Sequence, residues 1–126
     1  MHWFSFGVAL LAAIGIIGVG VMYLFRPRVM TPNFGLPLPE AGPNIVWWLR
    51  LKGSRDIASG LVVMALMVWG SSYLLGMILM IEAIIPVCDM SLILAAKGST
   101  RTALGIHGVT AALMILAAIP LLTKVA

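Results

Sequence analysis

Residues 3–25 read WFSFGVALLAAIGIIGVGVMYLF, an unbroken apolar stretch without one charged side chain. A helix rises about 1.5 Å per residue, so about 20 residues cross the hydrocarbon core of a bilayer. The stretch stops at Arg26-Pro27-Arg28, where two cations can meet lipid headgroups and the proline ends the helix. These residues predict a membrane-spanning helix. Met1-His2-Trp3 lacks the basic start of a signal peptide, so we expect this span to be retained.

The rest of the chain has the same apolar character. Of its 126 residues, 62% are hydrophobic and 10% are charged, whereas a soluble domain has about 45–50% and about 25%. A chain of this length forms one domain, too small to bury so much apolar surface without lipid. The net charge of +4 does not indicate nucleic-acid binding, because the basic residues stand at the ends of apolar runs.

Four apolar runs predict an all-α fold, an integral membrane four-helix bundle that forms a single domain over residues 1–126. Ser54 and Ser99 are candidate N-caps of the second and fourth helices. A proline-rich loop, 26–54, separates the first two helices, since prolines forbid a continuous helix there. The predicted spans cover about 3–25, 55–73, 74–96 and 100–122.

The end of this loop, residues 45–52, reads IVWWLRLK and mixes aromatic, apolar and basic side chains. Such a mixture is typical of a short segment that lies in the membrane interface. It equally fits a plain aromatic belt that precedes the second helix. Both interpretations stay open at this point.

The distribution of cations predicts a multi-pass protein of defined orientation. Lys124 is the one lysine or arginine expected on the side of the two termini. By the positive-inside rule, the loops 26–54 and 97–99 are then cytoplasmic and both termini are not. The cations that favour this orientation are Arg26, Arg28, Arg50, Lys52, Arg55, Lys97 and Arg101.

Of the four acidic residues, Glu40 lies in the loop, whereas Asp56, Glu82 and Asp89 fall within or at the edge of apolar runs. A charged side chain at the centre of a membrane helix costs at least ~2.5–3.5 kcal/mol, so it usually faces the bundle interior and has a partner. Glu82 and Asp89 are seven residues apart and share one helix face. Pro86 cannot donate to the Glu82 carbonyl, so we expect a kink there.

Counting residues from the cytoplasmic boundary places Asp89 and His107 at about 10 Å depth, with Glu82 about 10 Å deeper. Arg55 and Asp56 lie at the rim. Side chains from three helices then meet around one pocket, in which Glu82 is the catalytic acid, Asp89 or His107 is the base, and Arg55 and Asp56 bind the ligand. No cation lies at the depth of Glu82, and apolar surroundings favour a neutral carboxylic acid that can donate a proton.

Each of these residues also has a structural interpretation. Arg55 and Asp56 can form an interfacial ion pair, and Asp89 can pair with Lys97 or Arg101. His107 can make a plain hydrogen bond between helices. We predict no metal and no cofactor, because the sequence lacks His-x-x-x-His and Glu-x-x-His spacings and has no glycine-rich phosphate loop after a strand.

Residues 52–60 read KGSRDIASG, and Glu82, Asp89 and His107-Gly108 follow further along the chain. This set resembles the family of small four-helix membrane proteins called domain of unknown function 4267. The loop Asn33-Phe34-Gly35-Leu36-Pro37 is similar to that family as well, so the resemblance covers nearly the whole chain. By size and helix number the chain is also loosely similar to the DoxX-like group. The resemblance implies a four-helix membrane fold and implies no reaction. It gives weight to one set of residues, namely Arg55, Asp56, Glu82, Asp89 and His107.

Three functions compete at this point. The first is a pocket for a lipophilic small molecule within the bilayer, with isomerisation or cyclisation by acid–base chemistry. The second is a proton-coupled small-molecule transporter in which Glu82 titrates, which would favour a homo-oligomer because four short helices enclose little. The third is an accessory subunit of a membrane complex, in which the polar residues only pair with one another.

Overall fold

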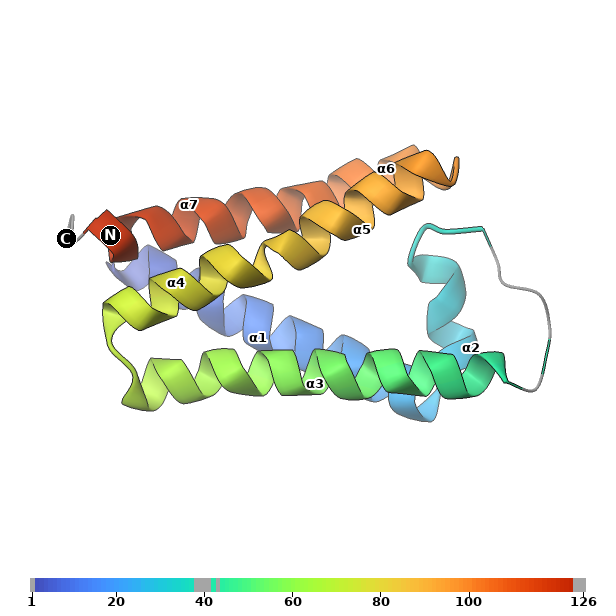
Figure 1. Cartoon of the computed structure of the whole chain (residues 1–126), viewed down its shortest axis with the longest axis horizontal. Coiled ribbons are helices and arrows are strands. Elements are labelled where there is room, and N and C mark those ends of the chain that lie inside the picture. Colours follow the sequence, from blue (N-terminus) through green and yellow to red (C-terminus); the bar gives the residue numbers. More distant parts are fainter. Residues whose placement is uncertain (1, 38–41, 43, 124–126) are drawn as a thin grey trace.

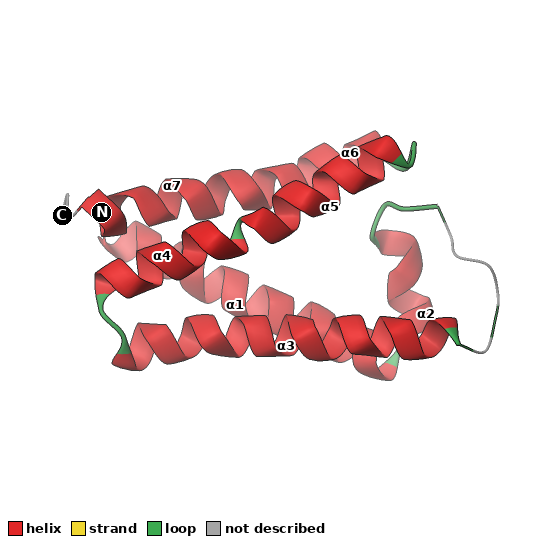
Figure 2. Ribbon diagram, viewed as in Figure 1, coloured by secondary structure: helices red, strands yellow, loops and turns green. Residues whose placement is uncertain are grey.

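The computed structural model describes residues 2–37, 42 and 44–123. Two residues of the predicted topology, Glu40 in the loop and Lys124 near the carboxyl terminus, lie outside these described residues. Every regular element in the described ranges is a helix (Figure 2). In chain order these are α1 (His2–Phe25), α2 (Pro27–Met30), η1 (Thr31–Asn33), α3 (Ile45–Trp69), α4 (Ser72–Glu82), α5 (Ile84–Ala95), α6 (Thr100–Thr102), η2 (Ala103–Gly108) and α7 (Val109–Thr123).

Three helices of the described residues are long and apolar enough to cross a membrane: Trp3–Phe25, Ser72–Ala95 and Thr100–Thr123. The predictions of an all-helical fold and of membrane-length helices are confirmed. The helix α3 is equally long, but it carries Lys52, Arg55 and Asp56 near its middle. Its place as a fourth span therefore stays a prediction.

The predicted third helix is divided in two at Ala83, so the described chain has five helices of eleven residues or more rather than four. Pro86 explains the division, because it has no N–H for the carbonyl of Glu82 and its ring crowds that carbonyl. The helix α4 ends at Glu82 and α5 begins at Ile84. The kink expected from Pro86 is therefore present one turn before the proline.

The sequence-based prediction starts the second long helix at residue 55, ten residues later than the structure does. The helix α3 begins at Ile45, so residues 45–52 are its first turns rather than a separate interfacial segment or a belt outside it. Ser54 is consequently not an N-cap, and its hydroxyl donates to the Leu51 carbonyl, 2.9 Å away, within the helix. Ser99 is an N-cap as predicted, because its hydroxyl accepts from the Thr102 N–H.

The helices run back and forth along one long axis (Figure 1). The start of α1 and the end of α7 lie at the same end as the turn between α3 and α4. The α1–α2 junction and the α5–α6 turn lie at the opposite end. The two loops that we predict to be cytoplasmic therefore share one end of the molecule.

The half of the bundle near the chain ends is filled by an apolar core. The helix α1 packs along α3, and α4 packs along α7. Their buried side chains are small on α1 and larger on α4, namely Ala9, Ala13, Val63, Leu75, Leu79, Ala83, Met114, Ala117, Ala118 and Leu121. The other half holds the acidic side chains Asp56 and Asp89 and their partners Lys52 and His107, and there the bundle is hollow.

Candidate functional site

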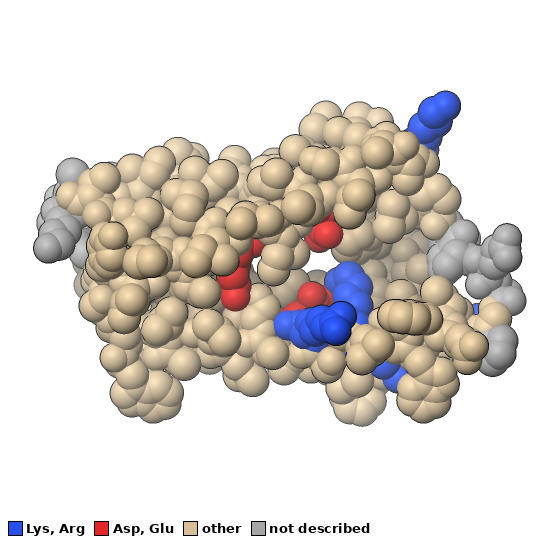
Figure 3. All heavy atoms as spheres, in the orientation of Figure 1, with Lys and Arg blue, Asp and Glu red and all other residues tan. Residues whose placement is uncertain are grey.

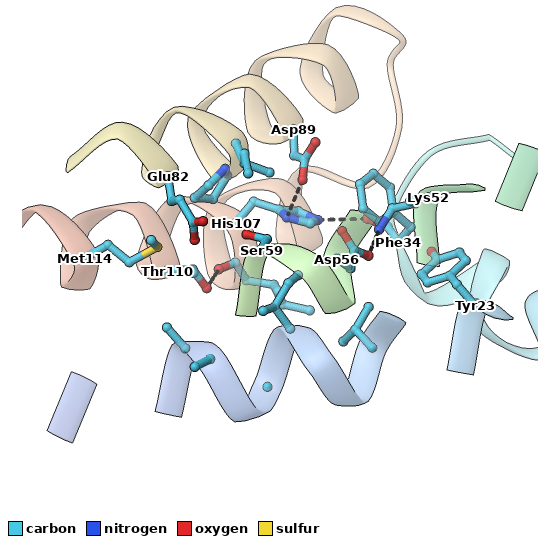
Figure 4. Close-up of a pocket in the computed structure, with 18 of the residues that line it drawn as sticks. Tyr23, Phe34, Lys52, Asp56, Ser59, Glu82, Asp89, His107, Thr110 and Met114 are labelled. Carbon is cyan, nitrogen blue, oxygen red and sulfur yellow. Dashed lines mark hydrogen bonds and ion pairs between the residues drawn. The ribbon is translucent and has the colours of Figure 1, made fainter. Parts of the chain in front are cut away.

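The bundle encloses a cavity of about 440 Å³ in its polar half. The wall supplied by α1 is apolar over most of its length and ends at Tyr23; its apolar residues are Leu11, Ala12, Ala13, Gly15, Ile16 and Val19. The rest of the lining mixes apolar and polar side chains, and the polar ones come from η1, α3, α4, α5, η2 and α7 (Figure 4). They are Asn33, Lys52, Asp56, Ser59, Glu82, Asp89, His107 and Thr110.

This cavity reaches the surface between α3 and α5. The helix α3 packs mainly on α1 and α5 mainly on η2, so α3 and α5 have little contact with each other. Figure 3 shows acidic and basic side chains around a hollow in this face. In a protein that spans a bilayer, such a side opening faces lipid.

Glu82 is the last residue of α4 and points into the cavity (Figure 4). Its carboxyl group is directed toward α3, where the Ser59 hydroxyl lies near it. Neither of the two ion pairs formed by the described residues includes Glu82. Its carboxyl group is therefore half-buried and open to the cavity.

Asp89 and His107 form a pair on the same wall. The Asp89 carboxylate Oδ2 lies 3.7 Å from His107 Nδ1. His107 Nε2 lies 3.1 Å from the Phe34 carbonyl oxygen, which can only accept, so Nε2 carries a hydrogen and donates it. Nδ1 is the ring nitrogen that faces Asp89, and at 3.7 Å the two groups are neighbours without a direct hydrogen bond.

The backbone around His107 is irregular in a way that suits such a site. Residues Ala103–Gly108 form a π-helix, η2, between α6 and α7. Single π-helical turns inside α-helices are rare and are frequent at functional sites. The Phe34 ring packs on the imidazole with a centroid distance of 4.8 Å. His107 is therefore fixed by a carboxylate, a carbonyl and an aromatic ring.

We expect His107 to be protonated on Nε2 in the folded protein. The chain has two histidines, so a ¹⁵N-histidine-labelled His2→Gln variant in lipid nanodiscs gives a spectrum of His107 alone. Its nitrogen chemical shifts should report a hydrogen on Nε2 at neutral pH, because the Phe34 carbonyl requires one. A neutral ring with its hydrogen on Nδ1 would contradict this arrangement.

Asp56 pairs with Lys52 rather than with Arg55. The Lys52 Nζ lies 2.6 Å from Asp56 Oδ2, one helical turn away. It also lies 4.2 Å from the Tyr23 ring centroid and 5.1 Å from that of Phe34. Arg55 is exposed and lies outside the cavity. The structure therefore places Lys52 where the sequence had suggested Arg55, because α3 turns the side chain of Arg55 away.

The sequence-based prediction also missed the segment that closes the polar end of the cavity. Phe34 contacts His107 and Lys52, and the next residue, Gly35, accepts a hydrogen bond of 2.8 Å from the Ser99 N–H. Gly35 has φ +105°, and a Cβ there would lie 2.8 Å from Thr102 Cγ2. This position therefore requires glycine. The i, i+4 spacing of Lys52 and Asp56 was a signal available in the sequence, whereas the Phe34 contacts had none.

The described residues contain no group of three histidine, cysteine, aspartate or glutamate side chains placed to hold a metal ion. The chemistry that the lining itself offers is proton transfer and hydrogen bonding, from three carboxyl groups, an imidazole, an ammonium group, an amide and three hydroxyl groups.

Comparison with known proteins gives a match to a protein family. A family model described as "Domain of unknown function (DUF4267)" matches residues 13–122. That range includes every polar residue of the cavity wall. Neither the curated proteins nor the solved structures contain a match to the chain.

Proposed function

The chain belongs to the DUF4267 family, and we propose that this member is a multi-pass membrane protein that holds a lipophilic small molecule in its bundle and transfers protons to and from it. One observation carries the proposal. A cavity with an apolar wall on α1 faces three carboxyl groups and an imidazole on the other helices. Its volume of about 440 Å³ is within the ~300–1,000 Å³ usual for small-molecule sites.

The proposed reaction is an isomerisation or a ring closure. Glu82 gives a proton to one atom of the ligand, and the Asp89–His107 pair takes a proton from another atom. The composition of the ligand is then unchanged, and return of the proton from the pair to Glu82 restores the site. Such a reaction needs a placed acid and a placed base. Asp56, held by Lys52, lies on the same wall and contacts the polar end of the ligand.

The proposed route for the ligand is from the bilayer. The hollow between α3 and α5 faces the side of the bundle, whereas Phe34 and Gly35 cover the polar end. In the proposed topology this polar end is cytoplasmic, because exposed cations cluster there, and both termini are on the other side. The relevant exposed cations are Arg26, Arg28, Arg55, Lys97 and Arg101.

Two glycines of α1 give a matched test. A Cβ on Gly15 or on Gly18 meets nothing within 4 Å, yet only Gly15 lines the cavity. Gly15→Phe should therefore fill the cavity, and Gly18→Phe should place the same ring outside it. The probe is dodecanol with a terminal diazirine, photolysed with the protein in lipid nanodiscs, and the labelled residues are read by peptide mass spectrometry.

We expect saturable labelling of cavity residues such as Ile16 and Ile85 in the unchanged protein and in Gly18→Phe. Labelling should fall at least about tenfold in Gly15→Phe and should also weaken in Glu82→Gln. Labelling that never saturates, or that Gly15→Phe leaves unchanged, would contradict the proposal. Net probe flux in proteoliposomes that Glu82→Gln abolishes would assign transport in place of catalysis.

A further inference from the structure

We infer that the ligand of this cavity is positively charged at its polar end when it is bound, as a lipophilic amine is. The inference rests on the proposed function and narrows it to one class of ligand. It comes from three features of the cavity: its balance of charges, the way in which Lys52 is held, and the position of its apolar wall.

Acidic groups outnumber basic groups around the cavity. The described lining residues include the carboxyl groups of Asp56, Glu82 and Asp89, and they include one ammonium group, that of Lys52. His107 adds at most one further positive charge. Even then one carboxyl group, that of Glu82, has no basic partner among the described lining residues, and a basic ligand supplies one.

Lys52 is not free to bind an anionic ligand. Its Nζ already lies 2.6 Å from Asp56 Oδ2. The same ammonium group lies against the rings of Tyr23 and Phe34, at 4.2 Å and 5.1 Å from their centroids. A fatty acid or a phosphate would have to displace these three partners. It would also face Glu82 and Asp89 across a cavity with low polarity, where repulsion between like charges is strong.

A lipophilic amine fits both walls of the cavity. Its chain can lie along the apolar residues of α1, such as Ile16 and Val19. Its nitrogen then reaches Glu82, which has Ser59 beside it but no ion-pair partner among the described residues. In the proposed reaction Glu82 holds a proton before the ligand binds, and that proton passes to the more basic amine. The result is an ammonium group beside the Glu82 carboxylate.

The test compares three competitors with the same chain length: dodecylamine, dodecanol and dodecanoic acid. Each competitor is added to the protein and the diazirine dodecanol in nanodiscs of zwitterionic lipid, and the loss of labelling at the cavity residues is measured. The concentration of each competitor in the membrane is measured separately. We expect dodecylamine to compete at about tenfold lower membrane concentration than dodecanol. Dodecanoic acid should be the weakest of the three.

Two variants connect this preference to the carboxyl groups. Glu82→Gln and Asp89→Asn should each reduce the advantage of the amine over the alcohol. Arg101→Gln, which removes an exposed charge outside the cavity, should leave that advantage unchanged. An alcohol that competes as well as the amine, with saturable cavity labelling intact, would overturn this inference and leave the proposed function standing. Absence of saturable cavity labelling would overturn both.

Discussion

Replacing Gly60 with leucine is expected to lower the free energy of unfolding by about 2–3 kcal/mol, because it forces α1 and α3 apart. A Cβ at Gly60 would lie 2.7 Å from the Ala13 carbonyl oxygen and 2.9 Å from Ile16 Cγ2. The first of these atoms belongs to the backbone, so a side-chain movement cannot relieve the clash. Small residues at such positions let membrane helices approach closely.

The matched control for this prediction is Gly18→Leu. Gly18 lies in α1, the helix against which Gly60 of α3 packs. A Cβ on Gly18 nevertheless meets nothing within 4 Å. Unfolding by sodium dodecyl sulfate in mixed micelles, followed by tryptophan fluorescence, should show a large loss for Gly60→Leu and almost none for Gly18→Leu. Equal losses in both variants would mean that α1 and α3 do not pack through Gly60.

The second large effect is expected from Lys52→Met. This change leaves the Asp56 carboxylate, whose side chain is 14% exposed, without the cation that lies 2.6 Å away. Removing one partner of a buried ion pair is strongly destabilising, and for this partly exposed pair we expect a loss of about 2 kcal/mol. Arg55→Met removes a cation three residues further along the same helix and should cost little, because Arg55 is exposed.

A double variant separates the ion pair from other effects of the mutation. Each single variant leaves one charge of the pair without its partner, whereas the double variant Lys52→Met with Asp56→Asn removes both charges. The double variant should therefore lose less free energy of unfolding than the two single variants lose in sum. The same unfolding assay measures all three. If Arg55→Met proves as damaging as Lys52→Met, the partner of Asp56 in the membrane is not the one that the structure shows.

The sequence predicts the helices well because the signal for a membrane helix is local. The uncharged run Trp3–Phe25 and the missing N–H of Pro86 are sufficient to place α1 and the division between α4 and α5. Counting residues by depth also brought Asp89 and His107 to one level, and their atoms lie 3.7 Å apart. The start of α3 was predicted too late, because residues 45–52 mix charged and aromatic side chains and lack a clear apolar period.

What the sequence does not reveal depends on contacts between distant residues. The Phe34 carbonyl and His107 are 73 residues apart, and no periodicity connects a loop to a helix. The choice of Lys52 over Arg55 as the partner of Asp56 depends on where α3 begins, since only a continuous helix puts Lys52 one turn before Asp56. The cavity itself lies where α5 diverges from α3, an arrangement of two distant helices that no local pattern in the sequence indicates (Figure 1).

The central claim is that a lipophilic ligand sits in the cavity beside Glu82, and infrared difference spectroscopy tests it most directly. Dodecylamine is added to the protein in nanodiscs, and the difference spectrum is compared with those of Glu82→Gln and Gly15→Phe. The account predicts a change in a carboxyl band that is present in the unchanged protein and absent from both variants. A spectrum without such a change, or one that the two variants share, would contradict it.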